Sequence, residues 1–143
     1  MMKISSQWLE GRCFVASNGS GHSVVMDGSG GEAGSLKRGV SPMEMLLMGV
    51  AGCSSIDVVE ILKKQRQDVR DCIATVEGVR APTVPRVFTE IRIHFKIIGV
   101  GVKPEQAERA VQLSAEKYCS ASIMLGKAAK VSHSFEIVEA ESQ

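Results

Sequence analysis

Two cysteines carry the most direct chemistry that this sequence offers. Cys53 and Cys119 each lie in a segment that favours a helix, at residues 41–59 and 113–125. A thiol pair can reduce a peroxide, because a thiolate attacks the O–O bond and a second thiol then closes a disulfide. Each cysteine taken alone also fits an inert residue that packs as a small hydrophobe. The spacing of the two residues leaves both interpretations open.

Composition disfavours other kinds of site. The chain has 143 residues and a formal net charge of +1, with both signs mixed along it. A nucleic-acid partner is not expected, because such an interface needs clustered Lys and Arg. The four cysteines, at positions 13, 53, 72 and 119, form no CxxC pair, so no zinc site of the usual spacing is predicted. Cys13 and Cys72 lie in strand-like segments and are interpreted as packing residues.

The amino-terminal segment helps to predict the cellular compartment of the protein. Residues 1–10 contain no apolar core of a signal peptide. No apolar run approaches the roughly 20 residues that a membrane span needs. We therefore predict a cytoplasmic protein without a membrane partner, in a compartment where thiols stay reduced.

One long helix is the strongest local signal. Ser41 and Glu44 form a Ser-x-x-Glu capping box around Pro42, and the pattern continues to about Gln65 or Gln67. Residues 43–53 are apolar nearly all round, which indicates a helix buried on several sides. A chain of this size can scarcely cover such a helix alone, so a dimer is expected.

The remaining pattern predicts an α+β fold in the order β-β-β-α-β-β-α-α-β. Strands are predicted at residues 3–9, 13–16 and 23–26, a Gly-rich connector at 27–40, and strands at 72–79, 87–98 and 131–138. In 87–98 alternate residues share one apolar side, typical of an antiparallel sheet: Val87, Thr89, Ile91, Ile93, Phe95 and Ile97.

Pro104 begins a second helix, with Ala107, Ala110, Val111, Ser114 and Tyr118 on one stripe. Ser120 is expected to cap a third, ending near Gly126. Residues 1–143 form one predicted domain, with parts 1–40 and 41–143.

Two segments carry a family resemblance. Ser41-Pro42 with Ala51-Gly52-Cys53, and Cys119-Ser120 with Leu125, resemble the OsmC/Ohr family of organic hydroperoxide reductases. The resemblance covers nearly the whole chain. It is strongest to the YhfA-like branch, through residues 41–45, 53–59 and 115–120.

The resemblance implies a fold and an activity. Such proteins are intertwined homodimers around two long central helices. Cys53 would be the attacking thiolate and Cys119 the resolving thiol, with an external dithiol as reductant. Neither a metal nor an organic cofactor is expected. The apolar surroundings favour organic hydroperoxides as substrates.

The resemblance also implies a glutamate and an arginine at the site. Family members place the glutamate ten positions before the cysteine, where this chain has Met43; Glu44 is nine before and also explained by its capping role. Arg38, or else Arg12, is the candidate arginine. An alternative function stays open: a protein of the same fold without efficient peroxidase activity, which binds a small apolar or thiol-reactive ligand or senses redox state.

Overall fold

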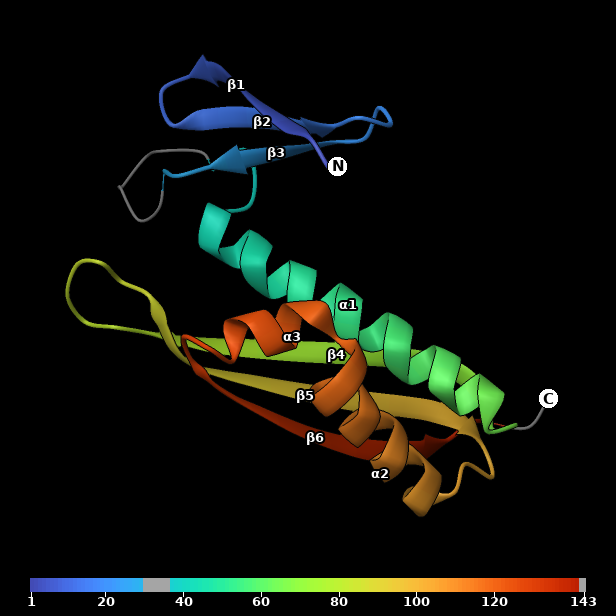
Figure 1. Cartoon of the computed structure of the whole chain (residues 1–143). Helices are drawn as coiled ribbons and strands as arrows, with labels where there is room; N and C mark the ends of the chain where they lie inside the picture. The colour runs from blue at the N-terminus through green and yellow to red at the C-terminus, as the bar shows by residue number, and fades with distance from the viewer. Residues whose placement is uncertain (30–36, 142–143) are drawn as a thin grey trace. The chain divides into compact units, whose positions relative to one another are not determined.

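The computed structural model describes residues 1–29 and 37–141 and confirms the α+β class (Figure 1). Its contacts divide the chain into two compact units, Met1–Leu46 and Leu47–Gln143. The observed order of strands and α-helices is the predicted one, with a π-helical turn added after the second helix. The single domain over 1–143 stays a prediction.

The amino-terminal unit is built on a three-stranded antiparallel sheet. Its strands are β1 (Ile4–Glu10), β2 (Cys13–Asn18) and β3 (Ser23–Asp27), in that order. Gly11 and Gly21 have φ of 54° and 88° at the turns, a conformation that favours glycine. Turns that contain these glycines thus join the three predicted strands into a sheet. Half of the predicted Gly-rich connector at 27–40, residues 30–36, lies outside the described residues.

Helix α1 (Pro42–Lys64) begins with the predicted capping box. The Glu44 N–H donates to Ser41 Oγ at 3.1 Å, and the Ser41 N–H donates to Glu44 Oε1 at 2.9 Å. These bonds satisfy two of the N–H groups that a helix start leaves without partners.

The single chain buries α1 on one side, and burial on several sides, which is expected together with a dimer, stays a prediction. Only one stripe of the helix is buried: Val50, Ser54, Val58 and Leu62. Leu46, Met48 and Ile56 are exposed, because a sheet and its neighbouring helices cover one face only. The expectation that no segment is apolar enough to span a membrane is wrong. By length and composition alone, helix α1 passes that test, as the core helices of soluble proteins also can.

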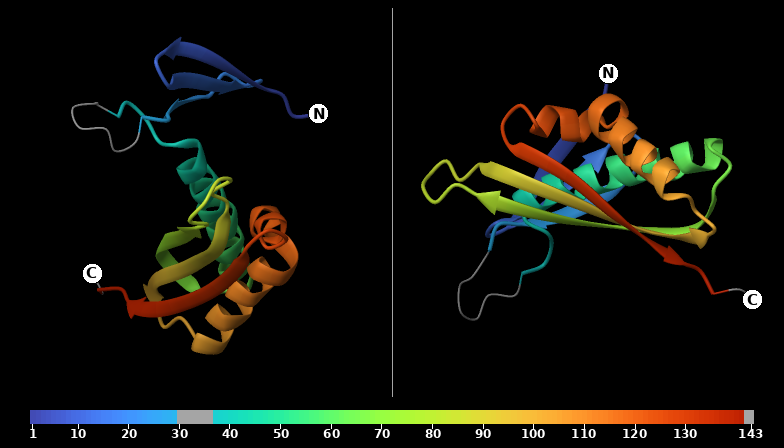
Figure 2. Two further views of the ribbon diagram at one scale, coloured as in Figure 1. Left: turned by 90° about the vertical axis from the view of Figure 1, so that its left-hand side faces the viewer. Right: turned by 90° about the horizontal axis from the view of Figure 1, so that it is seen from below.

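The carboxy-terminal unit holds a mixed sheet. Strands β4 (Asp68–Arg80) and β5 (Phe88–Val100) pair antiparallel, as predicted, whereas β5 and β6 (Lys130–Glu139) pair parallel. A parallel pair needs a long crossover. Here it consists of α2 (Pro104–Leu113), the π-helical turn η1 (Ser114–Tyr118) and α3 (Ser120–Leu125). Figures 1 and 2 show α2 and the α1 segment of this unit on the same face of the sheet.

Strand β5 forms the centre of the core. Four of its predicted inward residues are buried: Ile91, Ile93, Phe95 and Ile97. The prediction for Val87 and Thr89 is wrong, since both are exposed and Phe88 is buried instead. The register of β4 against β5 shifts between Val79 and Arg80, where this end of β5 begins. The alternation therefore does not extend to the start of the strand.

The π-helical turn changes the end of the second helix. The Cys119 N–H donates to the Ser114 carbonyl at 2.8 Å, a bond that encloses one residue more than an α-helical bond. The extra residue turns Tyr118 off the buried stripe on which it was predicted, and its exposed fraction is 50%. Cys119, not Ser120, is the N-cap of α3.

Candidate functional site

Helix α1 supplies two of the groups at the candidate site. Cys53 and Asp57 are four residues apart, so they lie one above the other on the same side of the helix. Both are half-buried. Ser54 belongs to the fully buried stripe, and its hydroxyl donates to the Val50 carbonyl at 2.6 Å. This segment thus presents a thiol and a carboxylate beside a buried hydroxyl.

The junction between η1 and α3 supplies the second thiol. The π-helical turn ends at Cys119, which then caps α3 with its side chain. Its Sγ accepts a hydrogen bond from the Ser122 N–H at 3.4 Å and lies 3.3 Å from the Ser54 hydroxyl oxygen. Cys119 is completely buried. Local backbone geometry therefore fixes this sulfur against α1.

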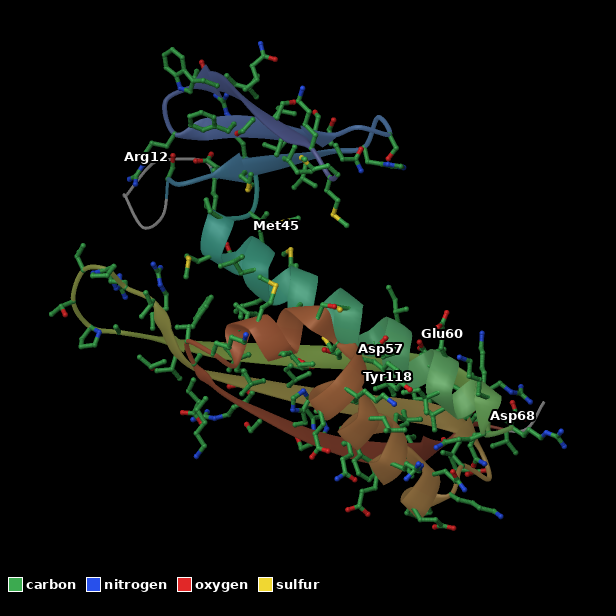
Figure 3. All side chains as sticks on the ribbon, in the orientation of Figure 1. Arg12, Met45, Asp57, Glu60, Asp68 and Tyr118 are labelled. Atoms are coloured by element: carbon green, nitrogen blue, oxygen red, sulfur yellow. The ribbon has the colours of Figure 1, made fainter. Side chains whose placement is uncertain are left out.

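The two segments meet at three chemically active groups. The Sγ atoms of Cys53 and Cys119 and a carboxylate oxygen of Asp57 all lie within 4.8 Å of one another. The Ser114 hydroxyl donates to Asp57 Oδ2 at 3.4 Å. Figure 3 labels Asp57 on α1. Both cysteines are free thiols.

The surroundings shift the pKa values of the two thiols in opposite directions. Burial raises the pKa of Cys119, but hydrogen bonds from Ser122 and Ser54, with a further one from Cys53, outweigh it and lower the pKa. The Ala121 N–H lowers the pKa of Cys53, yet burial, Cys119 and Asp57 together raise it. Hydrogen bonds to a thiolate favour the charged form. Of the two thiols, Cys119 is therefore the one whose thiolate form its surroundings favour.

Asp57 also departs from an ordinary surface carboxylate. Burial raises its pKa, the hydrogen bond from Ser114 partly offsets this, and the charge of Glu60 adds to the rise. Within the described part of the chain, Asp57 forms no ion pair. The site therefore gathers up to three anionic groups.

The other predicted site residues lie in the amino-terminal unit. Glu44 pairs with Lys37 at 2.5 Å, and Lys37 and Ser41 lower the pKa of Glu44 to about 2. The Arg38 guanidinium pairs with Glu10, while the backbone N–H of Arg38 donates to Asp27 Oδ2 at 3.0 Å. Arg12 lines a surface pocket in this unit. The capping role of Glu44 is confirmed; catalytic roles for Glu44, Arg38 and Arg12 stay predictions.

Sequence reasoning brought Cys53 and Cys119 into one hypothesis but missed the polar groups around them. Asp57 stands one helical turn after Cys53, a spacing that could have been noticed. Ser54, Ser114 and Ser122 carry no such signal, because serines are common at helix ends and surfaces. Only the packing of α1 against the η1–α3 junction assigns them to the site.

Comparisons with known proteins identify the family. The family model described as OsmC-like protein matches residues 31–134. Protein YhfA of Escherichia coli strain K12 is 47% identical over 97% of this chain and 100% of its own length.

Solved structures agree with this assignment. A crystal structure of a hypothetical protein from Aquifex aeolicus VF5 has a TM-score of 0.86 and 29% identity, covering 99% of this chain and 98% of that one. An organic hydroperoxide resistance protein OsmC from Legionella pneumophila has a TM-score of 0.69 and 20% identity, covering 95% and 96%. The second likeness concerns the fold alone. The chain belongs to the OsmC-like protein family.

Proposed function

We propose that this member of the OsmC-like family reduces organic hydroperoxides through Cys53 and Cys119. The observation that carries the proposal is the proximity of the two sulfurs, within 4.8 Å, at a site built by helices from distant parts of the sequence. A disulfide needs an S–S distance of about 2.05 Å. A modest movement of the Cys53 side chain would bring the sulfurs together.

In the first step, Cys53 attacks the peroxide. Cys53 is half-buried, whereas Cys119 has no exposed surface, so a peroxide reaches Cys53 first. Cys53 passes its proton to the neighbouring Cys119 thiolate, and the Cys53 thiolate so formed makes an S–O bond as the O–O bond breaks. The alkoxide takes up a proton and leaves as the alcohol, and Cys53 becomes a sulfenic acid.

The second step uses the lowered pKa of Cys119. Hydrogen bonds from Ser122 and Ser54 favour the thiolate of this buried residue. That thiolate attacks the sulfenic sulfur, the S–S bond forms and the S–O bond breaks, and the hydroxide leaves as water after taking a proton. An external dithiol then reduces the disulfide and is itself oxidised. No metal or organic cofactor enters these steps.

The test is the mass of the reduced protein after a brief, stoichiometric dose of cumene hydroperoxide. We expect a loss of two hydrogens, which peptide mapping assigns to a Cys53–Cys119 disulfide. Cys53→Ser should abolish turnover, and Cys119→Ser should stop at a sulfenic acid. Cys72→Ser is the matched control and should behave as wild type. Full turnover by Cys53→Ser, or slow scattered oxidation of Met and Cys in the wild type, would refute the proposal.

The proposed assembly is a homodimer. In the single chain, exposed apolar residues remain along α1, including Leu46, Met48 and Ile56. A second copy would cover part of this surface, in line with the intertwined dimers that the family resemblance implies. Light scattering at micromolar concentration should give twice the chain mass of 15.3 kDa; the monomer mass would contradict the proposal. We place the dimer in the cytoplasm, where a dithiol reductant is at hand.

One observation favours the alternative function. The pKa of Cys53 is raised by burial, Cys119 and Asp57 against the lowering effect of the Ala121 N–H, and none of these causes is a cation. A site with this bias suits a slow redox sensor, or a protein that binds a small apolar or thiol-reactive ligand. Rapid disulfide formation with cumene hydroperoxide would exclude this alternative.

A further inference from the structure

We propose that the side chains of Cys53, Cys119 and Asp57 form a binding site for a thiophilic divalent cation such as Zn²⁺. The site shares Cys53 and Cys119 with the proposed peroxide chemistry, but metal binding is measured independently of peroxide reduction. It would be a three-ligand site of two thiolates and one carboxylate.

The three ligand atoms lie close enough to share one ion. All lie within 4.8 Å of one another. In a tetrahedral zinc site with Zn–S bonds of about 2.3 Å, neighbouring ligand atoms stand roughly 3.8 Å apart. Small side-chain rotations therefore suffice to close the cluster around a metal. The atoms come from two backbone positions, the middle of α1 and the N-cap of α3.

The spacing of the ligands along α1 is suited to chelation. Cys53 and Asp57 are four residues apart on one helix. The same i, i+4 spacing lets two histidines on one helix face bind zinc in metalloproteases. Cys119 approaches from the η1–α3 junction and completes the set. This arrangement has no CxxC spacing, which explains why the sequence pattern did not indicate a metal site.

Hydrogen bonds from neighbouring residues orient two of the ligands. The Ser114 hydroxyl donates to Asp57 Oδ2 at 3.4 Å. The Ser122 N–H donates to Cys119 Sγ at 3.4 Å, and the Ser54 hydroxyl lies 3.3 Å from the same sulfur. Donors of this kind hold metal ligands in place and contribute to affinity. Each acts on an atom that the proposal assigns to the metal.

The charges of the cluster favour a cation. Fully deprotonated, the ligand set carries three negative charges, and Asp57 has no ion-pair partner among residues 1–29 and 37–141. Thiolates select soft or borderline metals such as Zn²⁺ over Mg²⁺ or Ca²⁺. Three protein ligands leave a fourth tetrahedral position for water or another small ligand. Cys53 and Asp57 are only half-buried, so a metal ion can reach the site from solvent.

The experiment uses the full-length reduced protein in chelator-free buffer. Zn²⁺ is titrated against a chromophoric zinc chelator, and Co²⁺ is added separately as a spectroscopic probe. We expect one Zn²⁺ per chain and a thiolate-to-Co²⁺ charge-transfer band. The band reports sulfur ligation in the wild type, so it does not depend on the folding of any variant.

Variants then test each ligand. Cys53→Ser and Cys119→Ser should each abolish the charge-transfer band or strongly weaken it. Asp57→Asn should lower Zn²⁺ affinity by more than about tenfold, and Ser114→Ala by about tenfold. Cys72→Ser and Glu60→Gln are the matched controls, a thiol and a carboxylate outside the cluster, and should bind as wild type.

Three results would overturn the proposal. The first is no Zn²⁺ binding at micromolar metal, together with no charge-transfer band. The second is binding that survives the loss of both Cys53 and Cys119. The third is unchanged affinity in Asp57→Asn, which removes the carboxylate from the ligand set. None of these results affects the peroxide assay, which is carried out with a chelator present.

Discussion

Replacing Ser54 with alanine is the most informative single change at the thiol pair. Its buried hydroxyl lies 3.3 Å from Cys119 Sγ and 2.6 Å from the Val50 carbonyl. The hydroxyl has one proton for these two acceptors. When Cys119 is a thiolate, we expect that proton to turn toward the sulfur.

The magnitude follows from exchanging one hydrogen bond for another. A hydrogen bond to a charged group contributes about 1.5–3 kcal/mol, and the neutral bond to Val50 that is given up contributes about 0.5–1.5 kcal/mol. The net stabilisation of the thiolate is therefore roughly 1 kcal/mol. Because 1.36 kcal/mol corresponds to one pKa unit, Ser54→Ala should raise the first alkylation midpoint of the pair by about 0.7 pH unit.

The assay is the rate of thiol alkylation against pH, with a chelator present, in a background where Cys13 and Cys72 are serine. The pair titrates as a unit, so the midpoint belongs to both thiols. Ser55→Ala is the control, since this neighbouring serine donates to neither sulfur in the described structure. A midpoint that is unchanged in Ser54→Ala, or that shifts equally in Ser55→Ala, would refute the reasoning.

Three further predictions concern stability. Gly99→Ala should destabilise the protein by about 1–3 kcal/mol in urea unfolding, because the new Cβ would lie 2.3 Å from the backbone oxygen of Asp68; a change under about 0.5 kcal/mol would contradict this. Glu44→Gln should remove a stabilisation that the wild type has above pH 4.5 and loses as pH falls to about 2, because Lys37 and Ser41 lower the pKa of Glu44; identical acid unfolding curves would contradict this. Burial lowers the pKa of His133, so the wild type should lose stability as pH falls below 6.5. The His133→Asn variant should lose less stability over the same range. Thermal unfolding of both proteins across this pH range tests the prediction.

Much of the fold could be predicted because its signals are local. The capping box of Ser41 and Glu44 sets the start of α1, and glycines set the turns of the amino-terminal sheet. The alternation from Ile91 to Ile97 predicts the central strand, because side chains of a strand alternate between its two faces. Where the structure departs from the prediction, a non-local feature is responsible. The register shift near Val79 displaces Thr89, and the π-helical turn displaces Tyr118.

For the candidate site too, some features follow from the sequence and others only from the tertiary structure. The sequence by itself determined the family resemblance and the two cysteines, because residue type and spacing along the chain suffice for both. Only the tertiary structure decided that Cys53, Asp57 and Cys119 form one cluster, and that the pKa of Cys119 is lowered while that of Cys53 is raised. The physical reason is that a thiol's pKa depends on burial and on donors brought from elsewhere in the chain. Here Ser54 and Ser122 belong to different helices and meet at the same sulfur.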